Sequence, residues 1–254
     1  MKALIFAAGL GTRLKPLTDN LPKALIPVGE KPLLEHIVLK LKASGVTEII
    51  VNVHHFADQI IDFLRGKNNF DIRIEISDER DNLLDTGGGI KNTAWFFNDG
   101  SPFLVHNVDI LSNVDLRALY AFHCQNNDCL STLVVNKRET YRYLLFDREN
   151  QLRGWINERT GETKPVINLN PLEYNKLAYA GIQVISPKIF EVMEKYDSKF
   201  PIMDFYLQNC YSEKIAGYIP ENLRMIDVGK LAALEPAEEF ANEIINQCEN
   251  LPIC

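Results

Sequence analysis

The sequence predicts an α/β fold, a three-layer α/β/α sandwich around a mostly parallel, mixed central sheet. Short apolar runs bounded by turn residues alternate with segments whose apolar residues recur at helical spacing. The early connections are long enough for crossover helices, which parallel strands require. Some later strands follow one another too closely for such crossovers, so part of the sheet is expected to be antiparallel.

The first half of the chain is predicted to alternate strand and helix. Residues 1–8 form an apolar run that ends at a glycine, as a buried parallel strand does. Residues 32–44 carry apolar side chains at helical spacing, with proline in the first turn and Gly45 after the end. The same reasoning predicts strands at 48–53, 72–76 and 102–106, and helices at 57–64, 89–97 and 115–123.

The second half is predicted to add strands before a closing helix. Pro236 is expected to split that helix into two pieces. No internal repeat, low-complexity tract or flexible linker interrupts the chain, so residues 1–254 are expected to form one domain. The predicted strands are 130–135, 143–146, 151–155 and 178–185, and the closing helix is 230–248.

The composition excludes several classes of protein. Of the 254 residues, 46% are hydrophobic and 24% are charged, which is typical of globular rather than disordered chains. The net charge is −7 and no long run of like charges occurs, so we expect neither nucleic acid nor a membrane as a partner. No stretch approaches the roughly 18 apolar residues that span a bilayer. We expect a cytoplasmic protein.

The cysteines are odd in number and unpatterned, whereas a secreted disulfide framework is even and regularly spaced. We interpret them as reduced thiols. His123 with Cys124 and Cys129 suggests zinc, but no second Cys or His pair accompanies them, which favours helix packing. The five cysteines are Cys124, Cys129, Cys210, Cys248 and Cys254.

A glycine-rich segment directly follows the first strand. Residues 7–18 are AAGLGTRLKPLT, and Leu-Pro-Lys-Ala follows at 21–24. Such a turn lets backbone N–H groups converge on an oxyanion, to which Arg13 adds a forked cation and Lys23 a point cation. The dinucleotide pattern fails at Leu14 and the P-loop pattern is missing. A solvated turn without a ligand is the alternative that a lone Gly-x-Gly leaves open.

The whole string, Gly-x-Gly-Thr-Arg-Leu-x-Pro-Leu-Thr followed by Pro-Lys, resembles the signature of the NDP-sugar pyrophosphorylases, the sugar-1-phosphate nucleotidyltransferases. The resemblance implies a Rossmann-like nucleotide-diphospho-sugar transferase fold. It also implies that the loop wraps a triphosphate, that the arginine holds the outer phosphates and that the lysine reaches the α-phosphate. The implied nucleotide-binding residues here are Ala7, Ala8, Gly9, Leu10, Gly11, Thr12, Arg13 and Lys23, the last two being catalytic.

Two aspartates follow apolar segments, where open α/β sheets bind ligands. Asp109 ends the strand that begins near residue 103, and Asp227 lies in an Asp-Val-Gly turn. Each taken singly is also compatible with a helix cap or a turn. They look like the family's two metal-binding aspartates, which implies Mg²⁺ as cofactor and a catalytic role for Asp109. Val108 and Lys230 depart from the family's usual glycine and threonine.

The triplet Gly87-Gly88-Gly89 weakens a helix start unless something must lie against its backbone. In the family this loop lies along the nucleobase, which implies nucleotide contacts for Thr86, Gly87 and Gly88, with Ser77 hydrogen-bonding the base. Thr-Gly-Gly-Gly-Ile looks like the branch that contains N-acetylmuramate 1-phosphate uridylyltransferases and related mannose- and heptose-1-phosphate transferases.

The sugar-phosphate end resembles the family less closely. Residues 178–182 are similar to its Gly-Ile segment, which implies sugar contacts for Ala180 and Gly181 beside Asn107. The family's Glu-Lys-Pro element has two rival matches. Glu158 and Arg159 fit its spacing, whereas Lys164 fits its composition.

The resemblance implies Mg²⁺-dependent in-line attack of a sugar 1-phosphate on the α-phosphate of UTP or GTP, giving an NDP-sugar and pyrophosphate. The product is expected to be a UDP- or GDP-sugar for cell-wall or surface-glycan metabolism. Residues 1–112 are expected to bind the nucleotide and residues 113–254 the sugar phosphate, in a monomer or homodimer. A catalytically silent regulatory protein that binds sugar nucleotides is the alternative.

Overall fold

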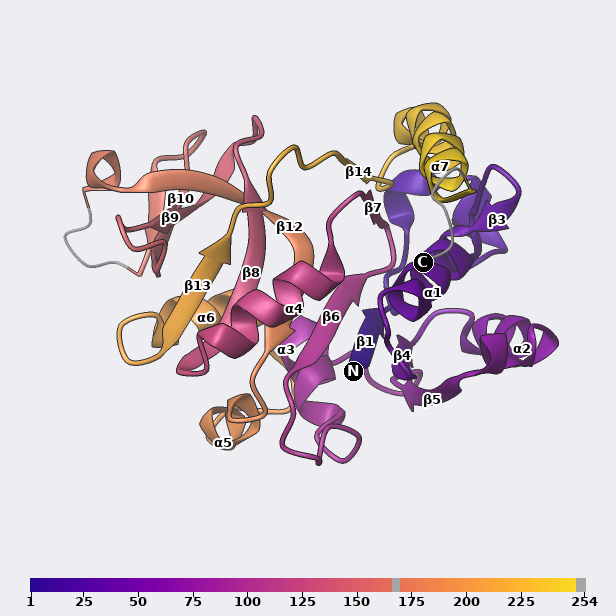
Figure 1. The fold of residues 1–254 in the computed structure, drawn as a ribbon, viewed down its shortest axis with the longest axis horizontal. Coiled ribbons are helices and arrows are strands. Elements are labelled where there is room, and N and C mark those ends of the chain that lie inside the picture. The colour runs from indigo at the N-terminus through magenta and orange to yellow at the C-terminus, as the bar shows by residue number, and fades with distance from the viewer. Residues whose placement is uncertain (166–169, 250–254) are drawn as a thin grey trace.

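The central feature of the computed structural model is a mixed sheet (Figure 1). The model describes residues 1–165 and 170–249, and the side chains of its last helix as far as residue 243. Within these residues ten strands form the sheet, and two strand pairs lie outside it. The ten are β1 (Lys2–Phe6), β4 (Glu48–Val53), β5 (Arg73–Asp78), β6 (Phe103–Asn107), β8 (Cys129–Asn136), β9 (Arg142–Phe146), β10 (Leu152–Asn157), β11 (Glu162–Lys164), β12 (Asn175–Ile185) and β13 (Lys214–Tyr218). The pairs are β2 (Pro27–Val28) with β3 (Lys31–Pro32), and β7 (Ile110–Ser112) with β14 (Met225–Asp227).

Strand directions divide the sheet into a parallel and a mixed part. Strands β5, β4, β1 and β6 are parallel neighbours in that order. The long strand β12 is antiparallel to β6 on one side, and on the other it pairs with β8 and then β9. Short connections make β9, β10 and β11 antiparallel. The prediction of a mostly parallel sheet with an antiparallel part is confirmed.

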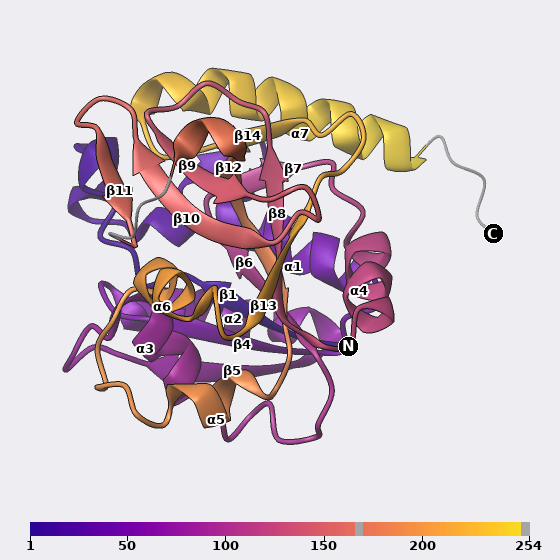
Figure 2. The same cartoon turned by 90° about the vertical axis from the view of Figure 1, so that its left-hand side faces the viewer.

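Helices cover both faces of the sheet because its central strands are apolar on both sides. In β1, Ala3 and Ile5 face one buried cluster and Leu4 faces the other. The first cluster takes side chains from α1, α2, α4 and α7, and the second from α3, α5 and α6; Figure 2 shows α7 and α5 on opposite sides of the sheet. The helices are α1 (Leu33–Ala43), α2 (Ala57–Gly66), α3 (Asp85–Asn92), α4 (Leu116–Gln125), α5 (Ile189–Met193), α6 (Ile202–Asn209) and α7 (Leu234–Glu249).

Two helix predictions need correction. The helix predicted at 89–97 begins four residues earlier and ends at Asn92, because Thr93 closes a turn on the Ile90 carbonyl and the phenylalanines beyond pack into the core. The closing helix does not split at Pro236. A 3-10 turn at Leu231–Ala233 precedes α7, and Pro236 lies in the first turn of α7, where its missing N–H costs nothing.

Several predictions concern single side chains. Cys124, Cys129 and Cys210 are free thiols, whereas the Cys248 side chain and Cys254 lie outside what the structure describes. His123 packs α4 against β8 and shares a 2.9 Å hydrogen bond with the Thr132 hydroxyl. Among the described helices none has the length and apolar character that crossing a membrane requires.

Candidate active site

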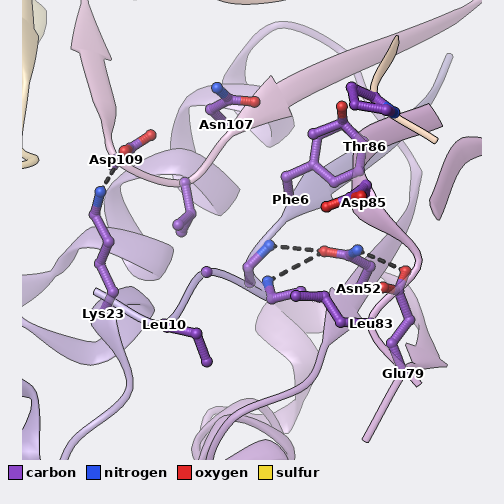
Figure 3. A pocket seen from close by; sticks show the side chains of 15 residues that line it. Phe6, Leu10, Lys23, Asn52, Glu79, Leu83, Asp85, Thr86, Asn107 and Asp109 are labelled. Carbon is purple, nitrogen blue, oxygen red and sulfur yellow. Dashed lines mark hydrogen bonds and ion pairs between the residues drawn. The ribbon is translucent and has the colours of Figure 1, made fainter. Parts of the chain in front are cut away.

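A pocket of about 300 Å³ lies at the carboxyl ends of β1, β4, β5 and β6 (Figure 3). The amino ends of α3 and α6 complete its border through Thr86 and Pro201. Eight residues that the sequence assigned to the nucleotide, the sugar phosphate or the metal line it, namely Ala7, Ala8, Gly9, Leu10, Lys23, Thr86, Asn107 and Asp109. Seven further lining residues were not assigned a role from the sequence, namely Phe6, Asn52, Glu79, Leu83, Asp85, Val108 and Pro201.

The glycine loop folds back on itself and so positions Lys23. Gly11 adopts a φ of 63°, a left-handed conformation that favours glycine. A Cβ there would lie 2.8 Å from Thr18 Cγ2 and 3.1 Å from Lys23 Cβ. The Thr18 hydroxyl also donates a 2.9 Å hydrogen bond to the Gly11 carbonyl. The loop therefore closes over the start of the Lys23 segment, and a larger residue at Gly11 would force the two apart.

Lys23 and Asp109 form an ion pair across the pocket (Figure 3). Both side chains are largely buried, with 11% of Lys23 and 22% of Asp109 exposed. Asp109 lies two residues beyond the end of β6, and Lys23 comes from the glycine loop. The sequence-predicted cation for the α-phosphate and the predicted metal ligand are thus direct neighbours.

The strand pair β7 and β14 brings Asp227 beside Asp109. Asp227 is in register with Ile110, and the Val228 N–H donates a 2.8 Å hydrogen bond to the Asp109 carbonyl. A Cβ on Gly229 would lie 2.8 Å from Asp227 Oδ1 and 2.9 Å from a terminal nitrogen of Arg13. Arg13 and Asp227 therefore both lie against Gly229, at the same edge as Asp109.

The carboxylates at this edge fit a metal ion that takes its remaining ligands from the substrate and from water. In the part of the chain that the structure describes, no group of three or more His, Cys, Asp or Glu side chains could hold a metal alone. Asp109 and Asp227 supply two carboxylates from adjacent segments. Mg²⁺ is typically bound by one or two carboxylates together with phosphate oxygens and water.

Asn52 and Glu79 form a buried hydrogen-bonded pair that the sequence analysis missed. Asn52 Oδ1 accepts from the N–H groups of Ala7 and Ala8, and its Nδ2 donates to Glu79 Oε1 at 2.8 Å. Burial raises the pKa of the Glu79 carboxyl. In the sequence, the sign that could have pointed to this pair is Asn52 itself, a polar residue among the buried β-branched residues of β4.

The glycine triplet lies against the protein's own chain. The N–H groups of Gly87 and Gly88 donate to the Phe200 carbonyl at 2.8 and 3.2 Å, and Thr86 Oγ1 accepts from the Ile202 N–H at 2.9 Å. Thr86 lines the pocket, but the two glycines do not. Ser77 is buried on β5 outside the pocket lining and accepts a hydrogen bond from Asn92 at 3.1 Å.

In the part of the chain that is predicted to bind the sugar phosphate, β12 bulges beside Asn107. The register of β12 shifts between Tyr179 and Gln183, which places Gly181 against Asn107 and leaves Ala180 buried. A Cβ on Gly181 would lie 3.0 Å from Asn107 Nδ2.

The rival matches to the Glu-Lys-Pro element lie in different places. Glu158 pairs with Lys176 at 2.8 Å, and Arg159 lies in the exposed turn after β10. Lys164 reaches Asp204 at 3.3 Å, in the first turn of the helix that follows the lining residue Pro201. Of the three, only Lys164 is tied to an element at the pocket border.

A Nucleotidyl transferase family model matches residues 2–242. The chain is 41% identical to the N-acetylmuramate alpha-1-phosphate uridylyltransferase of Neisseria meningitidis over 95% of this chain and 98% of that one. It is 31% identical to the Caulobacter vibrioides protein of the same name, covering 88% and 90%. Mannose-1-phosphate guanylyltransferase 1 of Arabidopsis thaliana is 29% identical over 76% of this chain, but only 52% of the plant protein is covered.

Solved structures show the same fold. HddC from Yersinia pseudotuberculosis, complexed with GMP-PN, superposes with a TM-score of 0.75 at 24% identity, covering 94% of this chain and 98% of that one. A glucose-1-phosphate thymidylyltransferase-like structure from Bacillus anthracis superposes with a TM-score of 0.79 at 19% identity, covering 96% of each chain. The family match over nearly the whole chain, with full-length relatives above 30% identity, establishes that this protein belongs to the nucleotidyl transferase family.

Proposed function

We propose that this protein joins a nucleoside triphosphate to a sugar 1-phosphate and releases pyrophosphate. The observation that carries the proposal is the gathering of Arg13, Lys23, Asp109 and Asp227 at one edge of the sheet, beside the pocket. These residues come from three distant parts of the chain. Two cations and two carboxylates around a pocket suit the handling of two anionic phosphate groups.

The reaction needs no general base, because the nucleophile is an ionised phosphate oxygen. That oxygen forms a bond to the α-phosphorus, while the bond from the α-phosphorus to the departing pyrophosphate breaks. Catalysis then rests on holding the two substrates in line and on neutralising the charge between them.

The chain's own residues divide this work by position. Lys23 neutralises charge at the α-phosphate, and Arg13 holds the outer phosphates that leave as pyrophosphate. In the structure the N–H groups of Ala7 and Ala8 are already bonded to Asn52. Within the described residues the amides of Gly9 and Leu10 have no protein acceptor, so they are available to donate to a triphosphate oxygen.

Asp109 and Asp227 would hold Mg²⁺. Their placement on adjacent segments supports this role. Bound there, the ion supplies positive charge between two anionic phosphates. Lys23 contacts Asp109 in the structure and balances the negative charge of that carboxylate. From the same position the lysine can contact the substrate.

Among candidate substrates, UTP with N-acetylmuramate 1-phosphate has the strongest support, since the 41% identical relative carries that name. GTP with mannose 1-phosphate is the second pair to test. We further propose that residues 1–112 bind the nucleotide and residues 113–254 the sugar phosphate, with Lys164 favoured over Glu158 and Arg159 as the phosphate contact. A cytoplasmic location, and a monomer or homodimer, remain predictions.

The test is a coupled pyrophosphate assay of the full chain with Mg²⁺, each nucleoside triphosphate and each sugar 1-phosphate, with the product identified by mass spectrometry. We expect pyrophosphate release only when a matching pair is present, with UTP giving the fastest turnover. A regulatory binding protein would saturate with nucleotide in a calorimetric titration yet release no pyrophosphate with any pair, and that outcome would overturn the proposal.

A further inference from the structure

We propose that Asn52 and Glu79 are positioning residues that hold the two sides of the nucleotide pocket at a fixed separation. We call them the Asn52–Glu79 relay. The relay joins the start of the glycine loop to the Leu84 loop that precedes α3, and it requires one amide and one carboxylate, one at each of the two positions. The kinetic part of this inference rests on the proposed function, whereas the structural part does not.

The first step concerns the orientation of the Asn52 amide. Its Oδ1 accepts hydrogen bonds from two backbone donors, the N–H of Ala7 at 2.9 Å and that of Ala8 at 3.2 Å. An amide nitrogen could satisfy neither donor. The oxygen of Asn52 must therefore face the glycine loop, and its NH₂ group must face away.

The second step concerns the partner of that NH₂ group. Asn52 Nδ2 donates to Glu79 Oε1 at 2.8 Å, and the Leu84 N–H donates to Glu79 Oε2 at 3.1 Å. Glu79 thus receives a donor on each oxygen. An ionised carboxylate provides two acceptors, whereas an amide or a protonated acid places a donor on one of the two sides.

The third step is that water has little access to the relay. Asn52 is 2% exposed and Glu79 is 3% exposed. A Cβ on Gly89 would lie 3.0 Å from Glu79 Oε1 and 3.2 Å from Asn52 Nδ2, so α3 packs directly on the relay. In the described part of the chain no salt bridge involves Glu79, and its two oxygens accept hydrogen bonds from Asn52 and the Leu84 N–H. A donor or acceptor without a matching partner at this position would therefore stay without a hydrogen bond.

The relay runs along one side of the pocket, and the dashed lines in Figure 3 show its bonds at Asn52 and from Asn52 to Glu79. At one end are Ala7 and Ala8, which lead into the loop proposed to hold the triphosphate. At the other end is Leu84, which leads into Asp85 and Thr86 on the opposite border. Loosening the relay should therefore weaken nucleotide binding while leaving the sugar-phosphate end unchanged.

The donor pattern allows an exchange experiment. Glu79→Gln alone places a donor against a donor at any pH. Asn52→Asp alone sets two carboxylates face to face, which favours uptake of a proton, so the defect of this variant should grow as the pH rises. The double variant Asn52→Asp with Glu79→Gln restores the complete pattern, because the new carboxylate accepts from the loop and from Gln Nε2, while Gln Oε1 accepts from Leu84. It also preserves the charge. Glu35→Gln is the matched control, since Glu35 is a buried carboxyl on α1 that pairs with Lys67 outside the pocket lining.

We expect each single variant to raise the KM for the nucleoside triphosphate by about tenfold or more and the KM for the sugar 1-phosphate by less than about twofold. The double variant should return to within about threefold of wild type, and Glu35→Gln should leave both constants unchanged. Single variants that retain wild-type constants, or a double variant as impaired as the two single effects combined, would overturn the inference.

A second readout does not depend on turnover. Amide hydrogen exchange followed by NMR should show that Ala8 loses protection in each single variant and regains it in the double variant. Ala7 should change less, because its N–H also donates to the Asn52 backbone carbonyl at 3.2 Å. If a single variant fails to fold, recovery of folding in the double variant supports the relay, and failure of both contradicts it. A wild-type protein that is inactive with every substrate pair would disprove the proposed function, while the exchange pattern would still decide the relay.

Discussion

Gly88 shows how the lack of a side chain shapes one side of the pocket. A Cβ on Gly88 would lie 2.1 Å from the Ser198 carbonyl oxygen, and one on Gly87 would lie 2.3 Å from the Phe200 ring. The segment of residues 198–200 therefore rests directly on the amino end of α3. The sequence predicted that something must lie against this backbone, and the structure shows that the protein's own chain does so. A nucleobase contact by these glycines remains a prediction.

Gly88→Ala should consequently destabilise the fold. The new methyl group meets a backbone oxygen that cannot rotate away, so we expect a loss of about 1–3 kcal/mol in the free energy of unfolding. Urea denaturation monitored by circular dichroism measures it. Gly66→Ala is the control, because nothing lies within 4 Å of its Cβ position at the end of α2. Equal stability of the two variants would show that the segment 198–200 is not held as described.

Single residues also show where sequence reasoning succeeds and where it fails. Lys23 and Asp109 were both assigned to the site and form an ion pair there. Asn52 and Glu79 were missed, because each resembles an ordinary polar residue until the pairing of β4 and β5 brings them together. A chemical role carried by a contiguous motif is visible in the sequence, whereas one created by hydrogen bonds between strands is not.

At the scale of elements, the site depends on two very short strands. Strands β7 and β14 have three residues each, are separated by more than 110 positions, and place Asp227 beside Asp109. Strands this short carry no periodic signal, so their pairing could not be predicted from the sequence. The resemblance to a family indicated that the two aspartates belong together, and the strand pairing is how this chain brings them together.

Longer elements were predictable because their apolar residues recur with a clear period. The predicted strand at 48–53 has the same bounds as β4, and the predicted helix at 32–44 contains α1. The missed helix α6 spans eight residues after Pro201, and its apolar residues are almost contiguous, so no helical period stands out. Its position nevertheless matters for the site, since its amino end borders the pocket and holds Thr86.

At the scale of the whole molecule, the net charge of −7 coexists with two cations that lie together at the site. Lys23 and Arg13 both lie at the carboxyl edge of the sheet, Lys23 against Asp109 and Arg13 against Gly229. Carboxylates at the same edge compensate these cations until an anionic substrate arrives. The overall acidity therefore disfavours a broad surface for polyanions but is compatible with a small anionic ligand.

Two buried imidazoles should make the fold sensitive to acid. Burial, with a contribution from Lys40, lowers the pKa of His106 to about 3, and burial lowers that of His123 to about 4. The unfolded chain binds these protons near pH 6.5, so stability is complete above that pH and falls as the pH drops toward 4. Each imidazole contributes up to about 1.4 kcal/mol per pH unit in this window.

Urea denaturation at pH 7, 6 and 5 measures this dependence. His123→Gln should reduce the slope by about half, because one of the two groups no longer titrates. The raised pKa of Glu79 acts in the opposite direction and makes the observed slope smaller. A wild-type stability that stays constant from pH 7 to 5 would contradict the buried, neutral state of these histidines.

The most direct test of the account is pyrophosphate release by Asp109→Asn compared with wild type and with Asp99→Asn. Asp99 also pairs with a lysine, Lys2, at 3.0 Å, but outside the pocket lining, so its variant controls for loss of an aspartate–lysine pair. We predict that Asp109→Asn lowers turnover by about a hundredfold or more with an unchanged circular dichroism spectrum, while Asp99→Asn remains near wild type. Near-normal pyrophosphate release by Asp109→Asn would contradict the assignment of this pocket as the site of nucleotidyl transfer.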